Sequence, residues 1–273
     1  MHTTHALRSS GRHAVSVLLS IGLFSGALTS AQSEPGQLVQ GNSGTMFGAT
    51  VTTWARMAPD GTVLSAGATL PMALIENAPA MPGGMAPMAG PPSGSVPFAV
   101  DFPAAVKATT FLDHVDVGWI AGGHPPVYLV PHFDLHFFTV SAQAVQAIDC
   151  KDLSQASLAQ LAPHYLPAVP PDTQPAEVCR PFMGFHSLPM TDLVPGMKFD
   201  KTMLAVYYAG QLNAIEPMIT RATLMKKQSF SLPMPALAIV GKATRFPTHF
   251  EAVFDAANDA YQLTFSAFIE KTR

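Results

Sequence analysis

The sequence predicts a mainly β protein, an antiparallel barrel or sandwich with two short helices. Three stretches each pair two β-rich segments across a tight turn, which is the pattern of β-hairpins. Little helical periodicity lies between these pairs, so the strands are expected to form antiparallel sheet. The 273 residues contain no GxGxxG, P-loop or GxSxG motif, so no nucleotide or serine-hydrolase site is indicated.

Residues 1–31 have the three parts of a cleavable signal peptide. Arg8 and Arg12 make a basic start, residues 14–28 are apolar, and small residues precede Gln32, where we place the cleavage. The apolar run is shorter than the roughly 20 residues that a membrane helix needs. No later stretch is apolar for longer. The sequence therefore predicts a periplasmic or secreted protein that does not span a membrane.

The charge balance gives no basis for nucleic-acid binding. The leader holds two of the fifteen basic residues and none of the eighteen acidic ones, so 13 and 18 remain and the net charge is −5. Lys226-Lys227 is the only basic doublet. A mildly acidic chain without a basic cluster lacks the electrostatic attraction that phosphate backbones and anionic membranes require.

A single β-rich domain is expected over residues 46–273, and two smaller domains are the alternative. Residues 32–45 are polar and read as a flexible lead-in. The first hairpin has strands at 47–57 and 62–66 around a Pro-Asp-Gly turn. Residues 77–97 hold Pro, Gly, Ala and Met without charge or periodicity, which predicts an irregular insertion.

The middle of the chain alternates between strand and helix signals. Apolar and polar residues alternate over 111–119 and 127–140, and both stretches are predicted strands. Ser141 and Ser154 each offer a helix N-cap before a short helical pattern. Residues 163–183 contain many prolines and are expected to be loop.

Two more hairpins are predicted in the C-terminal third. The first joins residues 203–209 to 212–220 through a Gly-Gln turn. The second joins residues 249–255 to 260–268 through an Ala-Ala-Asn-Asp turn.

Cys150 and Cys179 are the only two cysteines. In an oxidising compartment an even count favours a disulfide, and closing a loop of about 30 residues stabilises a fold by about 3–4 kcal/mol. Two separate buried thiols are the alternative. No CxxC motif indicates a redox or zinc site.

Histidine is concentrated in one part of the chain. Seven histidines follow the leader, and four of them lie in the 23 residues from 114 to 136. An even spread over the mature chain would put fewer than one there. The clustering predicts a site that uses imidazole.

The centre of this cluster is residues 132–138, with the sequence HFDLHFF. Because side chains alternate along a strand, His132, Asp134 and His136 share one face. The other face carries three apolar side chains that a core explains: Phe133, Leu135 and Phe137. Two imidazoles and a carboxylate are costly to bury unless they are paired or bind a metal.

The spacing limits how one ion could use this face. His132 and His136 lie about 13 Å apart on a regular strand, too far to chelate the same ion. An ion is therefore expected to take His132 with Asp134, or Asp134 with His136, unless a bulge shortens the span. Otherwise the two histidines serve different roles.

Three further residues are candidate ligands because each is titratable and lies among apolar neighbours: His124, His186 and Glu216. Imidazole and carboxylate ligands suit zinc, iron or manganese. His114 and Asp116 share a strand face that can support the ligands from behind, or can be an ordinary exposed face. His164 and His249 read as surface residues.

Several strings resemble a bacterial family of exported domains of unknown function, whose prototype is a hypothetical protein of Thermus. They are GHPPVYLVPHFDLHFF, MGFH, AIEPMITRATL and FPTHFEAVFDAANDAYQL, and they span most of residues 47–268. The resemblance implies a β-rich secreted domain with five motif residues: His124, His132, Asp134, His136 and Glu216. In that family a Trp usually follows the histidine matched by His186, whereas Ser187 follows here. The resemblance implies no reaction.

Two functional hypotheses follow. The first is an exported domain whose His/Asp/Glu site binds a divalent metal or a small polar ligand, with metal-assisted hydrolysis or hydration as the reaction class. The second is a non-catalytic envelope protein whose motif is a structural hydrogen-bond network, and whose sheet edges assemble it into homo-oligomers.

Overall fold

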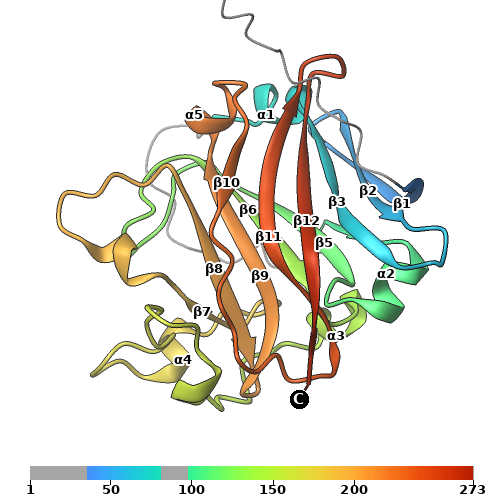
Figure 1. The fold of residues 1–273 in the computed structure, drawn as a ribbon. Helices are drawn as coiled ribbons and strands as arrows, with labels where there is room; N and C mark the ends of the chain where they lie inside the picture. Colours follow the sequence, from blue (N-terminus) through green and yellow to red (C-terminus); the bar gives the residue numbers. More distant parts are fainter. Residues whose placement is uncertain (1–35, 81–97, 273) are drawn as a thin grey trace, which may run out of the picture. The chain divides into compact units, whose positions relative to one another are not determined.

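The computed structural model describes residues 36–80 and 98–272, which form two antiparallel six-stranded sheets (Figure 1). Apolar side chains from both sheets meet in one large hydrophobic core. The predicted antiparallel β class is confirmed, and the architecture is a sandwich rather than a barrel.

The first sheet joins the N-terminal strands to the C-terminal ones. Its strands, in spatial order, are β1 (Gln37–Met46), β2 (Ala49–Met57), β3 (Val63–Pro71), β12 (Ala260–Lys271), β11 (Thr244–Asp255) and β10 (Phe230–Leu232). The predicted first and third hairpins are confirmed as the β2–β3 and β11–β12 pairs.

The second sheet carries the histidine motif. Its strands, in spatial order, are β4 (Ala99–Asp101), β5 (His114–Ile120), β6 (His132–Phe138), β9 (Gln211–Thr220), β8 (Lys201–Tyr208) and β7 (Phe185–Ser187). The predicted middle hairpin is the β8–β9 pair. The motif strand, β6, is hydrogen-bonded on both sides, to β5 and β9.

Helical structure in the described residues is confined to short segments. They are α1 (Met72–Glu76), α2 (Ala104–Thr109), α3 (Ala142–Gln146), α4 (Pro175–Val178), α5 (Arg221–Leu224) and the 3₁₀ turns η1 (Leu158–Gln160) and η2 (Met190–Leu193). Over these residues we find no helix with the length and apolar character needed to cross a membrane. Ser141 caps α3 as predicted, because its Oγ accepts a hydrogen bond from the Ala144 amide at 3.2 Å.

The helix predicted after Ser154 does not form. Only η1 is present, and it begins after Ser157, whose amide donates to Gln160 Oε1 at 2.8 Å. Leu158 is exposed, so the segment has no buried apolar stripe to support a longer helix. Pro163 also disfavours helical backbone in the residue before it.

The predicted flexible lead-in over residues 32–45 overlaps a strand. Residues 37–46 form β1, an edge strand that pairs with β2 and has a bulge between Gln40 and Ser43. Most of its side chains are exposed, so the strand needs few apolar residues and resembles a linker in composition. The predicted signal peptide lies outside the described residues, as does nearly all of the predicted insertion, from residue 81 to 97.

The strand predicted over 127–140 is shorter than expected. β6 begins at His132, and residues 121–131 form a loop over its N-terminal end. Pro125, Pro126 and Pro131 have no amide hydrogen, and three prolines within seven residues disfavour a regular hydrogen-bonded strand there.

The two faces of β6 differ as the alternation predicts. Phe133, Leu135 and Phe137 are fully buried in the core between the sheets. The ring of Phe137 packs edge-on against Phe265 of β12, with centroids 4.7 Å apart. The opposite face of β6 points away from the first sheet, and we call this side of the second sheet its outer face.

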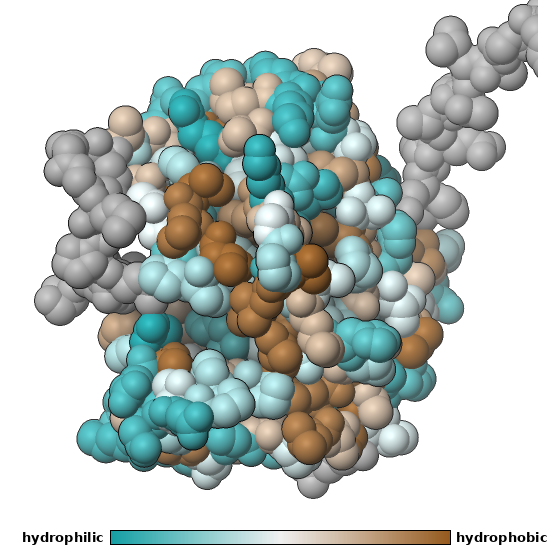
Figure 2. Space-filling view, turned by 90° about the vertical axis from the view of Figure 1, so that its left-hand side faces the viewer, coloured by the Kyte–Doolittle hydropathy of each residue, from teal (hydrophilic) through white to brown (hydrophobic). Residues whose placement is uncertain are grey.

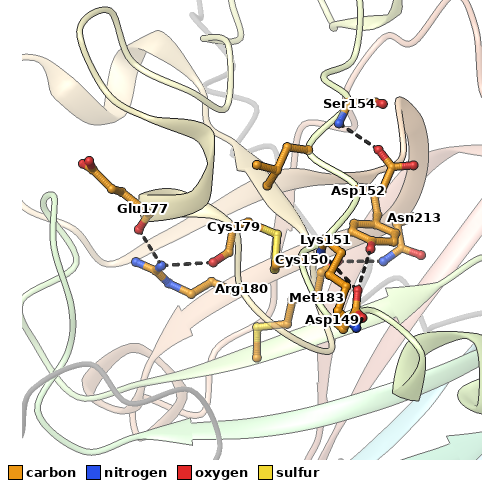
Figure 3. Close-up of a disulfide and its surroundings, with 12 residues drawn as sticks. Asp149, Cys150, Lys151, Asp152, Ser154, Glu177, Cys179, Arg180, Met183 and Asn213 are labelled. Carbon is orange, nitrogen blue, oxygen red and sulfur yellow. Dashed lines mark hydrogen bonds and ion pairs between the residues drawn. A yellow bond between two sulfur atoms is a disulfide. The ribbon is translucent and has the colours of Figure 1, made fainter.

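The predicted disulfide is present between Cys150 and Cys179 (Figure 3). It ties the loop after α3 to the end of α4. Directly after it, Arg180 and Gly184 exchange two backbone hydrogen bonds, at 2.9 and 2.8 Å, in the turn that leads into β7. The Asn213 side chain also donates to the Met183 carbonyl at 2.8 Å. The disulfide therefore anchors the segment that carries His186.

Candidate metal centre

The ladder of the second sheet brings separate parts of the chain together on its outer face. Asp134 pairs with Met218 and Phe138 pairs with Ala214, so Glu216 of β9 lies beside His136. His186 of β7 pairs with Val206 of β8. His124 comes from the loop that precedes β6 and packs against His132, with ring centroids 5.0 Å apart.

The six candidate ligands divide into two groups that can each hold a metal ion. The first triad is His124, His132 and Asp134, and the second triad is His136, His186 and Glu216. Within each triad the ligand atoms lie within 4.8 Å of one another. His132 and His136, too far apart for one ion on a regular strand, belong to different triads.

In the first triad both histidines turn Nε2 toward Asp134. Nε2 of His132 lies 3.0 Å from Oδ1, and Nε2 of His124 lies 3.9 Å from Oδ2. The Nδ1 atom of His132 lies 2.7 Å from the Val130 carbonyl oxygen, and that of His124 lies 2.8 Å from the Pro125 carbonyl oxygen. A carbonyl only accepts hydrogen bonds, so each Nδ1 is the protonated nitrogen and Nε2 of a neutral ring is left with its lone pair.

This arrangement leaves two buried acceptors facing each other. His132 Nε2 and Asp134 Oδ1 are both buried, and neither has a partner with hydrogen-bond geometry. A lone pair and a carboxylate oxygen at 3.0 Å repel unless they share a proton or a cation. Histidine ligands of metals commonly donate their other ring N–H to a carbonyl, as both rings do here.

The second triad is a closed set of three side chains. Nε2 of His136 and Nε2 of His186 lie 3.4 Å apart. Glu216 places Oε1 3.4 Å from the first nitrogen and Oε2 3.5 Å from the second. Glu216 Oε2 is buried without a hydrogen-bond partner.

Burial keeps the histidines of the second triad neutral, as metal ligands must be. It lowers the pKa of His136 to about 4 and that of His186 to about 3. Burial, together with the charge of Asp134, raises the pKa of Glu216 well above its ordinary value. Burial also acts to raise the pKa of Asp134, but a proton shared with the facing His132 imidazole outweighs it and lowers that pKa, so without a cation the pair is relieved by a proton.

One histidine of each triad reaches solvent. The side chains of His124 and His186 are 20% and 22% exposed, whereas the other four ligands are nearly fully buried. Small apolar clusters flank the ligands on the outer face, one around Tyr128 and Met218 and the other around Phe138. Solvent therefore approaches both triads from the side of the 121–131 loop and β7.

Asp192 supports the first triad, and nothing in the sequence indicated it. Its Oδ2 accepts hydrogen bonds from Tyr128 and Thr202, both at 2.7 Å. The Tyr128 carbonyl in turn accepts from the His124 amide at 2.8 Å. Asp192 lies in a proline-containing segment without strand or helix periodicity, LPMTDLVPG, so only the folded chain shows this role.

The remaining histidines and Asp116 lie outside both triads. His114 is buried, with Nδ1 3.1 Å from Asp113 Oδ1, rather than part of an exposed face. Asp116 is buried with an unpartnered Oδ1, and burial raises its pKa to about 6. His164 and His249 are exposed, as expected for surface residues.

Residues 59–119 match the family model described as TTHB210-like, hypothetical protein TTHB210. The resemblance to a family with a hypothetical Thermus protein as its prototype is thereby confirmed over these residues. The match ends before His124, so it includes none of the six candidate ligands. No curated protein and no solved structure matches the chain.

Proposed function

We propose that this chain is an exported protein that binds divalent transition-metal ions at its two triads. The observation that carries the proposal is the orientation of His132, which gives its proton to the Val130 carbonyl and turns a buried lone pair toward Asp134. His124 has the same arrangement toward Pro125 and Asp134. A cation bound between His132 Nε2 and Asp134 Oδ1 would replace the repulsion between these two acceptor atoms with attraction to both.

Each triad supplies two imidazoles and one carboxylate. This set suits zinc, iron or manganese, and it is the set that catalytic zinc sites and non-haem iron sites use with positions left for water or substrate. Metal-assisted hydrolysis or hydration of a small polar substrate is the reaction class that we propose. A bound ion would supply the polarisation of water, while the protein fixes the ligands and would admit substrate past His124 and His186.

Export is part of the proposal. The Cys150–Cys179 disulfide is typical of proteins outside the reducing cytoplasm, and the leader-like residues 1–31 agree with it. Mass spectrometry of the protein from its native host should find a mature N-terminus at Gln32. An intact N-terminal Met1 in the cytoplasmic fraction would contradict export.

The competing hypothesis is a non-catalytic envelope protein whose motif is a structural hydrogen-bond network. Such a network satisfies its buried atoms. Here His132 Nε2, Asp134 Oδ1 and Glu216 Oε2 are buried without hydrogen-bond partners, which favours the metal hypothesis. Assembly of copies through sheet edges is compatible with either hypothesis.

Metal analysis of the purified protein tests the proposal. The protein is stripped with a chelator, reloaded separately with Zn²⁺ or Mn²⁺, dialysed and measured by plasma mass spectrometry. We expect stoichiometric binding that falls in Asp134→Asn and in Glu216→Gln, with His249→Ala as the exposed-histidine control. A stable protein that retains neither ion would refute the proposal.

A further inference from the structure

The two triads lie side by side on one strand. Asp134 of the first triad and His136 of the second are two residues apart on the same face of β6. Such neighbours on a strand are about 6.6–6.8 Å apart.

From this arrangement we infer that the two triads form one paired centre, which holds a small oxyanion between two metal ions. The inference rests on the proposed function and adds to it the class of ligand. An oxyanion such as phosphate or a carboxylate presents two oxygens, so it can contact both ions at once.

The charges favour an anion over a neutral ligand. Each triad has one carboxylate, so each carries a net charge of +1 when it holds a divalent ion. Two such charges repel one another strongly where water is largely excluded. An anion between them removes that repulsion, which a neutral ligand does not.

The open sides of the two triads also fit a shared ligand. His124 and His186 are the partly exposed members, one from each triad. The other ligands are buried against the sheet. A ligand that enters from solvent therefore meets both triads from the side of these two histidines.

A fixed positive charge lies near this side. Arg180 lies in the turn that leads into β7, where its backbone exchanges two hydrogen bonds with Gly184, two residues before His186. Its Nη1 donates to the carbonyls of Glu177 and Cys179, at 3.0 and 3.3 Å (Figure 3). Figure 2 shows the side of the molecule that lies on the left in Figure 1, where apolar side chains gather in a band across the middle and polar side chains lie above and below it.

The test uses the full-length exported protein loaded with Mn²⁺ and inorganic phosphate as the probe. Metal content is counted first, spin–spin broadening between two Mn²⁺ ions is measured by electron paramagnetic resonance, and phosphate binding is measured by calorimetry. We expect two broadened ions per chain and phosphate binding that disappears when the metal is removed.

Single-triad variants supply the decisive comparison. Asp134→Asn and Glu216→Gln should each keep one ion, lose the broadening and bind phosphate at least tenfold more weakly. His124→Ala, in a partly exposed ligand, replaces Asp134→Asn if that variant does not fold. His249→Ala is the matched control and should behave as the parent protein.

The outcomes separate the two proposals. A parent protein without bound metal would overturn both. One ion per chain, two ions without phosphate binding, or equal phosphate binding by the single-triad variants would overturn the paired centre and leave the proposed metal function standing.

Discussion

The Nε2 atoms of His136 and His186 lie 3.4 Å apart, although β9 and β8 lie between their strands in the sheet. Three strand spacings correspond to about 14 Å between the backbones of β6 and β7. Both side chains therefore reach inward over the outer face, and the Glu216 carboxylate of β9 lies against both imidazoles. The second triad depends on the position of β7 as much as on the motif strand.

The two faces of β6 should respond differently to substitution. Leu135→Ala removes a fully buried core side chain and should lower the free energy of unfolding by about 2–5 kcal/mol, while the folded protein still binds metal. His136→Ala should lower metal occupancy and leave the circular dichroism spectrum unchanged. Equal destabilisation by both variants, with no change in metal content, would favour the structural-network hypothesis.

Loss of the disulfide should weaken the second triad selectively. The Cys150–Cys179 bond anchors the turn that leads into β7, so Cys150→Ser with Cys179→Ser should free His186 to move. We expect the free energy of unfolding to fall by about 3–4 kcal/mol. When the cysteine variant is combined with Asp134→Asn, so that only the second triad can bind, its metal affinity should also fall.

The matched control is the same cysteine pair combined with Glu216→Gln, which leaves only the first triad. Metal affinity should change little there, because the first triad takes its ligands from β6 and the loop before it. An equal loss of affinity in both backgrounds would show a general effect on folding instead.

Asp116→Asn should stabilise the protein at neutral pH. Burial raises the pKa of Asp116 to about 6, so folding favours the protonated carboxyl, and its ionisation costs stability as the pH rises from 3.8 through 6. The variant removes a penalty of up to about 3 kcal/mol at pH 8. In urea unfolding series the gap between variant and parent should shrink toward pH 4. A variant less stable than its parent at pH 8 would contradict this view.

The buried histidines of the metal-free protein should give the opposite pH dependence. The pKa of His186 is lowered to about 3, so between pH 6.5 and 3 the unfolded chain binds a proton that the folded chain does not. Stability therefore falls as the pH falls through this window, by about 1.4 kcal/mol per pH unit for one histidine.

Unfolding series in a chelator measure this effect for His186→Gln against the parent, with the exposed His249→Gln as control. The difference between parent and His186→Gln should change with pH, and that between parent and His249→Gln should change much less. A parallel pH profile for His186→Gln would contradict the lowered pKa.

Much of the fold could be predicted because short stretches of sequence determine its hairpins and strand faces. Each hairpin has its turn residues and its alternating strands in one stretch of sequence, and β6 shows its two faces in seven residues. The errors arose where tertiary contacts decide. β1 is polar because it is an edge strand, and the loop before β6 looks like strand until the missing proline donors are considered.

The candidate ligands could also be found from sequence, but their grouping could not. His132, Asp134 and His136 stand out by alternation within one strand. The division into two triads depends on the ladder that sets Glu216 beside His136 and on β7, which brings His186 across two strands. Neither strand pairing can be recognised from the spacing of residues along the sequence.

The alternation on β6 links the assembly of the site to the folding of the core. A one-residue slip of β6 against β5 and β9 would turn two histidines and an aspartate inward and expose two phenylalanines and a leucine. Because the slipped register buries polar groups and exposes apolar ones, the chain adopts the correct strand pairing without a bound ion. The strand-borne ligands are thus preorganised by hydrophobic burial, so an incoming ion has only the loop and edge-strand histidines left to position.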